Sequence, residues 1–244
     1  MDYYDYYGFR PYVSVAARRA QAARELAKLQ KKDSKTSPVE IEGRKIARTF
    51  WGEAWCNNLE RYSDYANRLP RGRTYVRNGS VVDLQVGPGH VTALVSGSTM
   101  YDVKVSVGPV EPARWRVVCK DCSGAIDSLI ELLQGRFSKG VMTRLCEEKT
   151  GLFPCPKDIR FTCSCPDWAS MCKHVAAVLY GIGARLDHQP ELLFTLRNVN
   201  QQDLIADAGS DLSKKSKRPA GAKVLASDDL SEMFGIEMAA STPP

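Results

Sequence analysis

The sequence of 244 residues has no long apolar run, and no window approaches the roughly 18 uninterrupted apolar residues of a membrane-spanning helix. Its first residues, MDYYDYYGFRPYV, lack the basic start and apolar centre of a secretory signal. We therefore expect neither secretion nor membrane insertion. Histidine is scarce, with three residues, and the 18 glycines and 13 prolines are too few for a fibrous or low-complexity chain. A globular protein is the expectation that remains.

Cysteine, by contrast, is plentiful, with eight residues. In a chain without an export signal, cysteines are expected to stay reduced in the cytoplasm, where clustered thiols bind metal or react instead of forming disulfides. The cysteines are therefore the first indication of function.

Positive charge is concentrated near the start of the chain. Residues 10–48 hold eleven lysines and arginines against four acids, while the whole chain carries a net charge of only +6. Good helix formers at Ala16–Lys32 predict a basic helix, which can meet phosphates without reading base sequence. A surface helix or a protein-docking helix is the alternative. The candidate nucleic-acid contacts are Arg18, Arg19, Arg24, Lys28, Lys31 and Lys32 on this helix, and Arg160, Lys173 and Arg185 nearer the C-terminus.

The middle of the chain predicts an α+β fold. A helix is expected from about Phe50 to Leu69, with Thr49 as its cap. Short β-rich runs follow over residues 74–107, and their Gly-containing breaks predict an antiparallel meander of three or four strands. Helices are then expected at residues 126–133 and 139–148. The predicted segments are a Tyr-rich arm and basic helix (1–48), a central α+β domain (49–150), a small β-loop-α zinc finger with following helices (151–207) and a flexible tail (208–244).

The clearest chemical signal lies between residues 159 and 186. Ile159, Phe161, Cys163 and Cys165 share one parity, so a strand would turn all four to the same face. Pro166 ends that strand, and after six intervening residues the chain returns a third sulfur at Cys172. A helix predicted from about Val175 would place Cys172 just before it and His174 in its first turn. Three sulfurs and one imidazole match tetrahedral Zn²⁺ with no vertex left for water, so we expect a structural metal and no catalysis.

These residues resemble a known family. The pattern Cys163-x-Cys165, six residues, then Cys172-x-His174 is similar to the SWIM zinc finger. The stretches RTFWGEAWCNNLERYSDYANRLPRGRTYVRNGSVVDLQV, SLIELLQGRFSKGVM and CPDWASMCKHVAAVLYGIGARL resemble the bacterial stand-alone SWIM zinc finger family over residues 6–207. The resemblance implies a module that binds DNA or protein and often accompanies helicase-like ATPases of the Swi/Snf type. We expect no membrane partner and no small-molecule substrate.

Other interpretations of the cysteines stay open at this point. His174 could activate a cysteine nucleophile, although this leaves Cys163 and Cys165 without a role. Cys119, Cys122, Cys146 and Cys155 could form a second metal site, but isolated thiols are the simpler account. The competing functions are a protein adaptor that uses zinc only for folding, and an enzyme built on the central domain. The central sequence shows no phosphate loop and no Ser-His pattern that would support an enzyme.

Overall fold

A computed structural model of the chain describes residues 13–31, 35–61, 68–123, 137–147, 149–167, 169 and 171–204. The chain divides into two compact units, Met1–Ala208 and Gly209–Pro244, and the second lies wholly outside the described residues. Also outside them lie the Tyr-rich start, Lys32, the helix predicted at 126–133 and the predicted tail. Among the described helices, none combines the length and apolar character needed to cross a bilayer.

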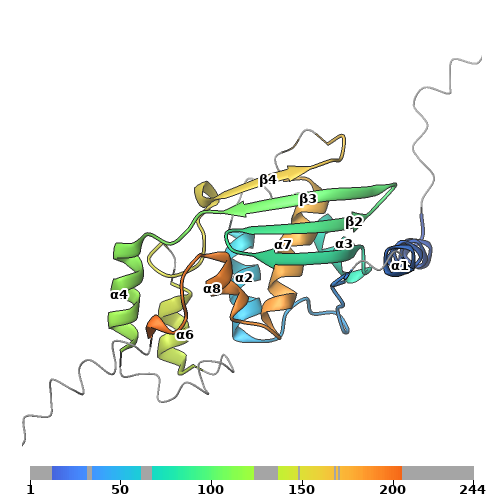
Figure 1. The fold of residues 1–244 in the computed structure, drawn as a ribbon. Helices are drawn as coiled ribbons and strands as arrows, with labels where there is room; N and C mark the ends of the chain where they lie inside the picture. The colour runs from blue at the N-terminus through green and yellow to red at the C-terminus, as the bar shows by residue number, and fades with distance from the viewer. Residues whose placement is uncertain are drawn as a thin grey trace, which may run out of the picture. The chain divides into compact units, whose positions relative to one another are not determined.

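The centre of the fold is a four-stranded antiparallel sheet, which confirms the predicted α+β class (Figure 1). Its strands, in spatial and chain order, are β1 (Val81–Gly87), β2 (His90–Ser96), β3 (Met100–Val107) and β4 (Ile159–Cys163). Side chains along β3 alternate between buried and exposed, as expected for a sheet covered on one face. The first three strands form the predicted meander. The fourth arrives from about 50 residues further along the chain and pairs with β3, with Val103 opposite Cys163.

The described helices are α1 (Val15–Lys31), α2 (Phe50–Glu60), α3 (Leu69–Arg77), α4 (Pro112–Cys122), α6 (Lys139–Leu145), α7 (Lys173–Leu186) and α8 (Leu192–Leu196), with a 3₁₀ turn η2 (Pro156–Asp158). Helix α7 packs on the covered face of the sheet, and α2 and α3 pack against α7 (Figure 1). Twelve of the fourteen residues of α7 are buried. The buried residues of the described elements form one core that extends from Val39 to Leu204.

Small side chains let α3 approach α7 closely. A Cβ added at Gly72 of α3 would lie 2.5 Å from the Cβ of Ala176 and 2.8 Å from its carbonyl carbon. On the neighbouring helix, the indole Nε1 of Trp55 donates a hydrogen bond to the carbonyl of Leu179 at 2.9 Å. The backbone of α7 is therefore in close contact with both α3 and α2.

The helix predicted at 50–69 and the strand predicted to begin at Thr74 are wrong in their bounds. Helix α2 ends at Glu60, and Thr74–Arg77 is the last turn of α3. Leu69, Gly72 and Val76 are buried at helical spacing, so packing on α7 overrides the β preference of this stretch. Gly79, with φ of +68°, follows the end of α3 and takes the left-handed conformation common at helix ends, not a hairpin turn.

Helix α2 begins directly after Thr49 as predicted, but the threonine hydroxyl does not cap its own helix. It donates to Oδ1 of Asp187 at 2.7 Å, and the backbone N–H of Arg48 donates to Oδ2 of the same carboxylate at 2.6 Å. Asp187 directly follows α7. One carboxylate therefore joins the start of α2 to the end of α7.

Candidate metal centre

Two elements bring the four predicted ligands together. Cys163 ends β4 and Cys165 lies two residues beyond it, whereas Cys172 is the N-cap of α7 and His174 is in its first turn. The turn after β4 is fixed to β3 at Ser164, whose N–H donates to the carbonyl of Asp102 at 3.0 Å. The hydroxyl of Ser164 accepts from the N–H of Asp102, also at 3.0 Å. Ser164 lies between Cys163 and Cys165, so its two hydrogen bonds to β3 hold this cysteine pair in place beside the sheet.

The predicted parity of this segment is confirmed by burial. Ile159 is buried and Phe161, Cys163 and Cys165 are partly buried, whereas the three residues between them, Arg160, Thr162 and Ser164, are exposed. Both sulfurs of the pair therefore face the helix side of the sheet, where α7 begins.

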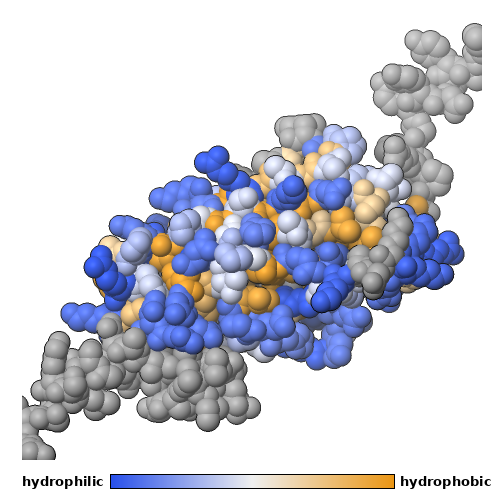
Figure 2. Space-filling view, viewed as in Figure 1, coloured by the Kyte–Doolittle hydropathy of each residue, from blue (hydrophilic) through white to orange (hydrophobic). Residues whose placement is uncertain are grey.

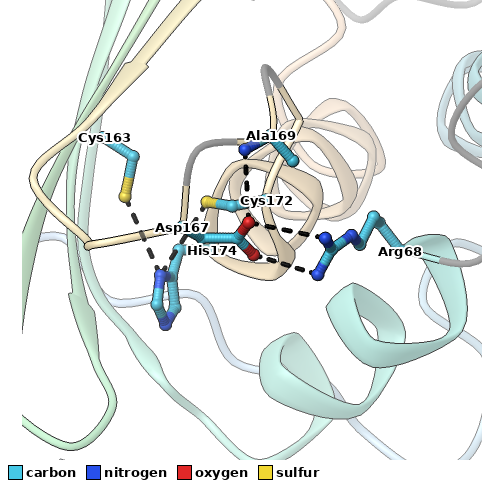
Figure 3. A network of polar contacts seen from close by, with 6 residues as sticks. All are labelled: Arg68, Cys163, Asp167, Ala169, Cys172 and His174. Atoms are coloured by element: carbon cyan, nitrogen blue, oxygen red, sulfur yellow. Dashed lines mark hydrogen bonds and ion pairs between the residues drawn. The ribbon is translucent and has the colours of Figure 1, made fainter.

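The four side chains converge tightly enough to hold a metal ion. One ligand atom from each of Cys163, Cys165, Cys172 and His174 can be chosen so that all lie within 4.8 Å of one another. Nδ1 of His174 is 3.8 Å from Sγ of Cys163 and 3.9 Å from Sγ of Cys172, and Figure 3 shows both sulfurs directed at that nitrogen. The same imidazole nitrogen therefore faces the strand cysteine and the helix cysteine.

Burial favours the uncharged form of both kinds of ligand. It raises the pKa of the Cys163 and Cys172 thiols, because a thiolate loses hydration in this site. Burial, reinforced by the neighbouring charge of Lys173, lowers the pKa of His174 to about 4, so its ring is neutral at physiological pH. A neutral imidazole is the form that ligates metal, and a divalent ion would supply the positive charge that neighbouring thiolates require.

Two tyrosines enclose the imidazole. The ring of Tyr101, on β3, stacks on His174 with centroids 4.2 Å apart, and the ring of Tyr75, on α3, meets it edge-on at 5.3 Å. Nε2 of His174 is buried and has no hydrogen-bond partner among the described residues. It points toward Gly97, where an added Cβ would lie 3.2 Å from Nε2 and 2.7 Å from the Tyr101 ring. A side chain at position 97 would therefore displace the histidine or the tyrosine.

The loop between the two ligand pairs is tied to α3 by a two-pronged ion pair. Nη1 of Arg68 donates to Oδ2 of Asp167 at 2.9 Å, and Nη2 donates to Oδ1 at 3.4 Å (Figure 3). Oδ1 also accepts from the N–H of Ala169 at 3.2 Å, which folds the loop back on itself. Asp167 in a Pro-Asp loop is a turn signal that sequence reasoning could have used. Arg68, Tyr75 and Tyr101 carry no such signal, because each reaches the site from a distant element.

The other cysteines are not part of this cluster. Cys119 and Cys122 lie on α4, Cys146 directly follows α6 and Cys155 precedes η2. Within the part of the chain that the structure describes, the Cys163–His174 cluster is the one group of three or more potential ligands that could share a metal ion. The alternative second site is therefore not assembled.

The three predicted phosphate-contacting residues outside α1 do not all lie together. Arg160 is exposed on β4 and Lys173 begins α7, but Arg185 lies twelve residues further along α7, about 18 Å away at 1.5 Å per residue. Nη2 of Arg185 donates to the carbonyls of Ser37 and Pro38, each at 3.0 Å. Arg185 therefore lies apart from Lys173 and fastens residues 37–38, and a phosphate contact by Arg160, Lys173 or Arg185 stays a prediction. The remaining predicted cations within the described residues, all on α1, are Arg18, Arg19, Arg24, Lys28 and Lys31.

Comparisons with known proteins give one informative similarity. The chain is 33% identical over 165 residues to Uncharacterized protein Rv2102 of Mycobacterium tuberculosis, a match that covers 66% of this chain and 59% of that protein. No family model matches the chain, and no solved structure matches it. The match spans less than two thirds of that protein's length and adds no activity.

Proposed function

We propose that the chain is a non-enzymatic zinc protein of the SWIM-finger type, in which one structural Zn²⁺ fixes a surface that binds DNA or a DNA-translocating, helicase-like ATPase. The observation that carries the proposal is the convergence of Cys163, Cys165, Cys172 and His174 from a strand end and a helix start. The order of these residues along strand, loop and helix agrees with the SWIM resemblance of the sequence.

The donor set favours zinc. Soft thiolates with one imidazole select Zn²⁺ over Mg²⁺ or Ca²⁺, which prefer oxygen ligands. Zn–S bonds of about 2.3 Å and Zn–N bonds of about 2.0 Å give a tetrahedron with edges of about 3.5–3.8 Å. The two sulfur–nitrogen distances of 3.8 and 3.9 Å are about 0.3–0.4 Å longer than the sulfur–nitrogen edge of about 3.5 Å, so small side-chain shifts would bring these atoms to bonding positions. Four protein ligands complete the tetrahedron, which supports a structural ion.

The charge distribution supports a nucleic-acid or nucleic-acid-associated partner. Helix α1 carries five lysines and arginines within the described residues and one acid, Glu25. The surface over α1 is hydrophilic in the space-filling view (Figure 2). The ATPase is an expectation from the SWIM resemblance. A pure protein adaptor is the second candidate, and it is favoured by the exposed Val13 and Val15 at the start of the same helix.

The metal proposal is tested by counting zinc in the purified full-length protein with native mass spectrometry. We expect one zinc per chain, and loss of zinc in Cys172→Ser. Structural zinc in finger peptides contributes roughly 10–16 kcal/mol at pH 7, so the segment around α7 should lose protection from proteolysis when zinc is removed. Cys122→Ser is the matched control, because Cys122 is also buried but lies outside the cluster. A wild-type protein purified with zinc present that holds none would refute the proposal.

The partner proposal is tested by affinity purification from native lysate with and without nuclease. Recovery of nucleic acid, or of an ATPase that is lost after nuclease treatment, supports a DNA-bound module. Partners that survive nuclease and high salt, and that contain no ATPase, would favour the adaptor instead, because apolar docking responds little to salt.

A further inference from the structure

A recess lies beside the metal centre, where α1, α3 and the start of α7 meet. It has a volume of about 370 Å³ and is lined by Arg18, Arg71, Thr74, Tyr75 and Lys173. Helix α1 is held there by two side chains: Gln21 donates to the carbonyl of Gly97 at 2.7 Å, and Arg19 donates to the carbonyl of Arg77 at 3.5 Å. The recess therefore joins a predicted basic helix to the metal-bearing end of α7.

The lining carries three positive charges and no acid. Arg18 and Lys173 are both partly buried, and neither they nor Arg71 form an ion pair with a described residue. Two other arginines at α3 are paired: Arg68, just before the helix, pairs with Asp167 at 2.9 Å, and Arg73 pairs with Glu60 at 3.4 Å. Like charges that share a partly buried recess repel one another, and an anion bound among them would remove that repulsion.

Lys173 connects the recess to the metal ligands. It stands between Cys172 and His174 in the chain, and its Nζ lies 5.6 Å from the centroid of the Tyr75 ring. The same ring contacts His174 edge-on. A metal ion that fixes Cys172 and His174 would therefore also fix the backbone that carries Lys173.

We propose that this recess binds a phosphate group of a polynucleotide backbone, a step that rests on the proposed function and names its contact site. Arg18, Arg71 and Lys173 would neutralise the phosphate. The remaining cations of α1 extend away from the recess as far as Lys31, about 20 Å along the helix from Arg18, and Lys28 among them is paired with Glu25 at 2.8 Å. A free phosphate would need the recess alone, whereas a row of cations of this length matches successive phosphates of a strand.

The test measures binding of the zinc-loaded full-length protein to a fluorescein-labelled DNA duplex of mixed sequence, about two helical turns long. Fluorescence anisotropy is recorded over a range of about 50 to 200 mM NaCl, where phosphate contacts make affinity strongly salt-dependent. Arg18→Gln, Arg71→Gln and Lys173→Gln are compared with Arg116→Gln, an exposed arginine on α4 outside the recess.

We expect each recess variant to bind about three- to tenfold more weakly than wild type, because each removes one charge that meets the phosphate. The slope of log affinity against log salt should fall in magnitude by about 0.9 for each phosphate that is no longer neutralised. Arg116→Gln should match wild type, and all variants should keep one zinc.

The outcomes separate this inference from the proposed function. Wild-type binding to DNA with recess variants indistinguishable from Arg116→Gln refutes the recess and leaves a DNA-binding zinc protein in place. Absence of DNA binding by the zinc-loaded wild type refutes the recess as a polynucleotide site. The zinc count tests the metal proposal independently of this result. Binding of inorganic phosphate at micromolar concentration, without DNA binding, would show a small-anion site and would equally overturn the assignment to a polynucleotide.

Discussion

Because α3 lies so close to α7, a glycine-to-alanine substitution in α3 should destabilise the protein, which is the opposite of its usual effect in a helix. Replacing glycine with alanine inside a helix normally stabilises it by up to about 1 kcal/mol. At Gly72, however, the new Cβ would lie 2.5 Å from Cβ of Ala176, 2.8 Å from its carbonyl carbon and 2.9 Å from the backbone nitrogen of Ala177. Ordinary carbon contacts are about 3.5–4.0 Å, so α3 would have to move away from α7 by about 1 Å.

The cost of that movement should exceed the gain in helix propensity. Overpacking in a core costs about 1–3 kcal/mol, and two of the three close atoms are backbone atoms that cannot rotate away, which favours the upper end. After subtracting about 1 kcal/mol of propensity, Gly72→Ala should destabilise the fold by about 2 kcal/mol. For a domain of this size, that lowers Tm by about 4–8 °C.

Thermal unfolding followed by circular dichroism, with zinc and with chelator, checks this value. The control is Gly140→Ala at the exposed start of α6, where the nearest atom to the new Cβ is the Ser138 hydroxyl at 3.9 Å. That variant should keep Tm or raise it by up to about 4 °C. If Gly72→Ala melts at or above the wild-type temperature while the control behaves as expected, the contact between α3 and α7 is not as close as the reasoning requires.

Three further predictions each concern one side chain. Arg68→Gln should cost about 1 kcal/mol and speed zinc release to a chelator, because the loop loses its ion pair with Asp167; an unchanged release rate would show that the pair does not hold the loop. Burial raises the pKa of Cys56 from 9.0 to about 12, so the folded state keeps a proton that the unfolded state releases. The contribution of Cys56 to stability should therefore be constant below about pH 9 and fall by up to about 1.4 kcal/mol per pH unit above it. Denaturant titrations of wild type and Cys56→Ala from about pH 8 to about pH 11 test this, and equal slopes would contradict it. Arg185→Gln should speed amide hydrogen exchange at Val39, whose N–H donates to the carbonyl of Val81, because the variant cannot form the bonds from Arg185 to residues 37–38; unchanged exchange would contradict that role.

The metal cluster could be predicted because its information is local. All four ligands lie within twelve residues, and strand parity together with the helix start fixes their directions. The meander could be predicted in the same way, since consecutive strands pair through short turns. Neither prediction required knowledge of a distant residue.

Helix α3 could not be recognised from its own sequence. Thr74 and Val76 favour strands locally and Asn78-Gly79 is a strong hairpin signal, so the stretch resembles the start of the meander. Its helical state comes from packing against α7, about 100 residues later. The recess could not be predicted for the same reason. Arg18 and Lys173 are recognisable as cations in the sequence, but no local pattern shows that they line one recess. Arg71 carries no distinguishing signal in the sequence.

The short span of the ligand set also bears on the order of folding. Closing a loop of about ten residues takes roughly 10–100 ns, and its entropic cost is small. The segment from Cys163 to His174 can therefore capture its ion while the rest of the chain is still unstructured. Pairing of β4 with β3 must bridge about 50 residues and should come later. Zinc present during refolding should accordingly speed the first kinetic phase, whereas zinc added afterwards should only slow unfolding.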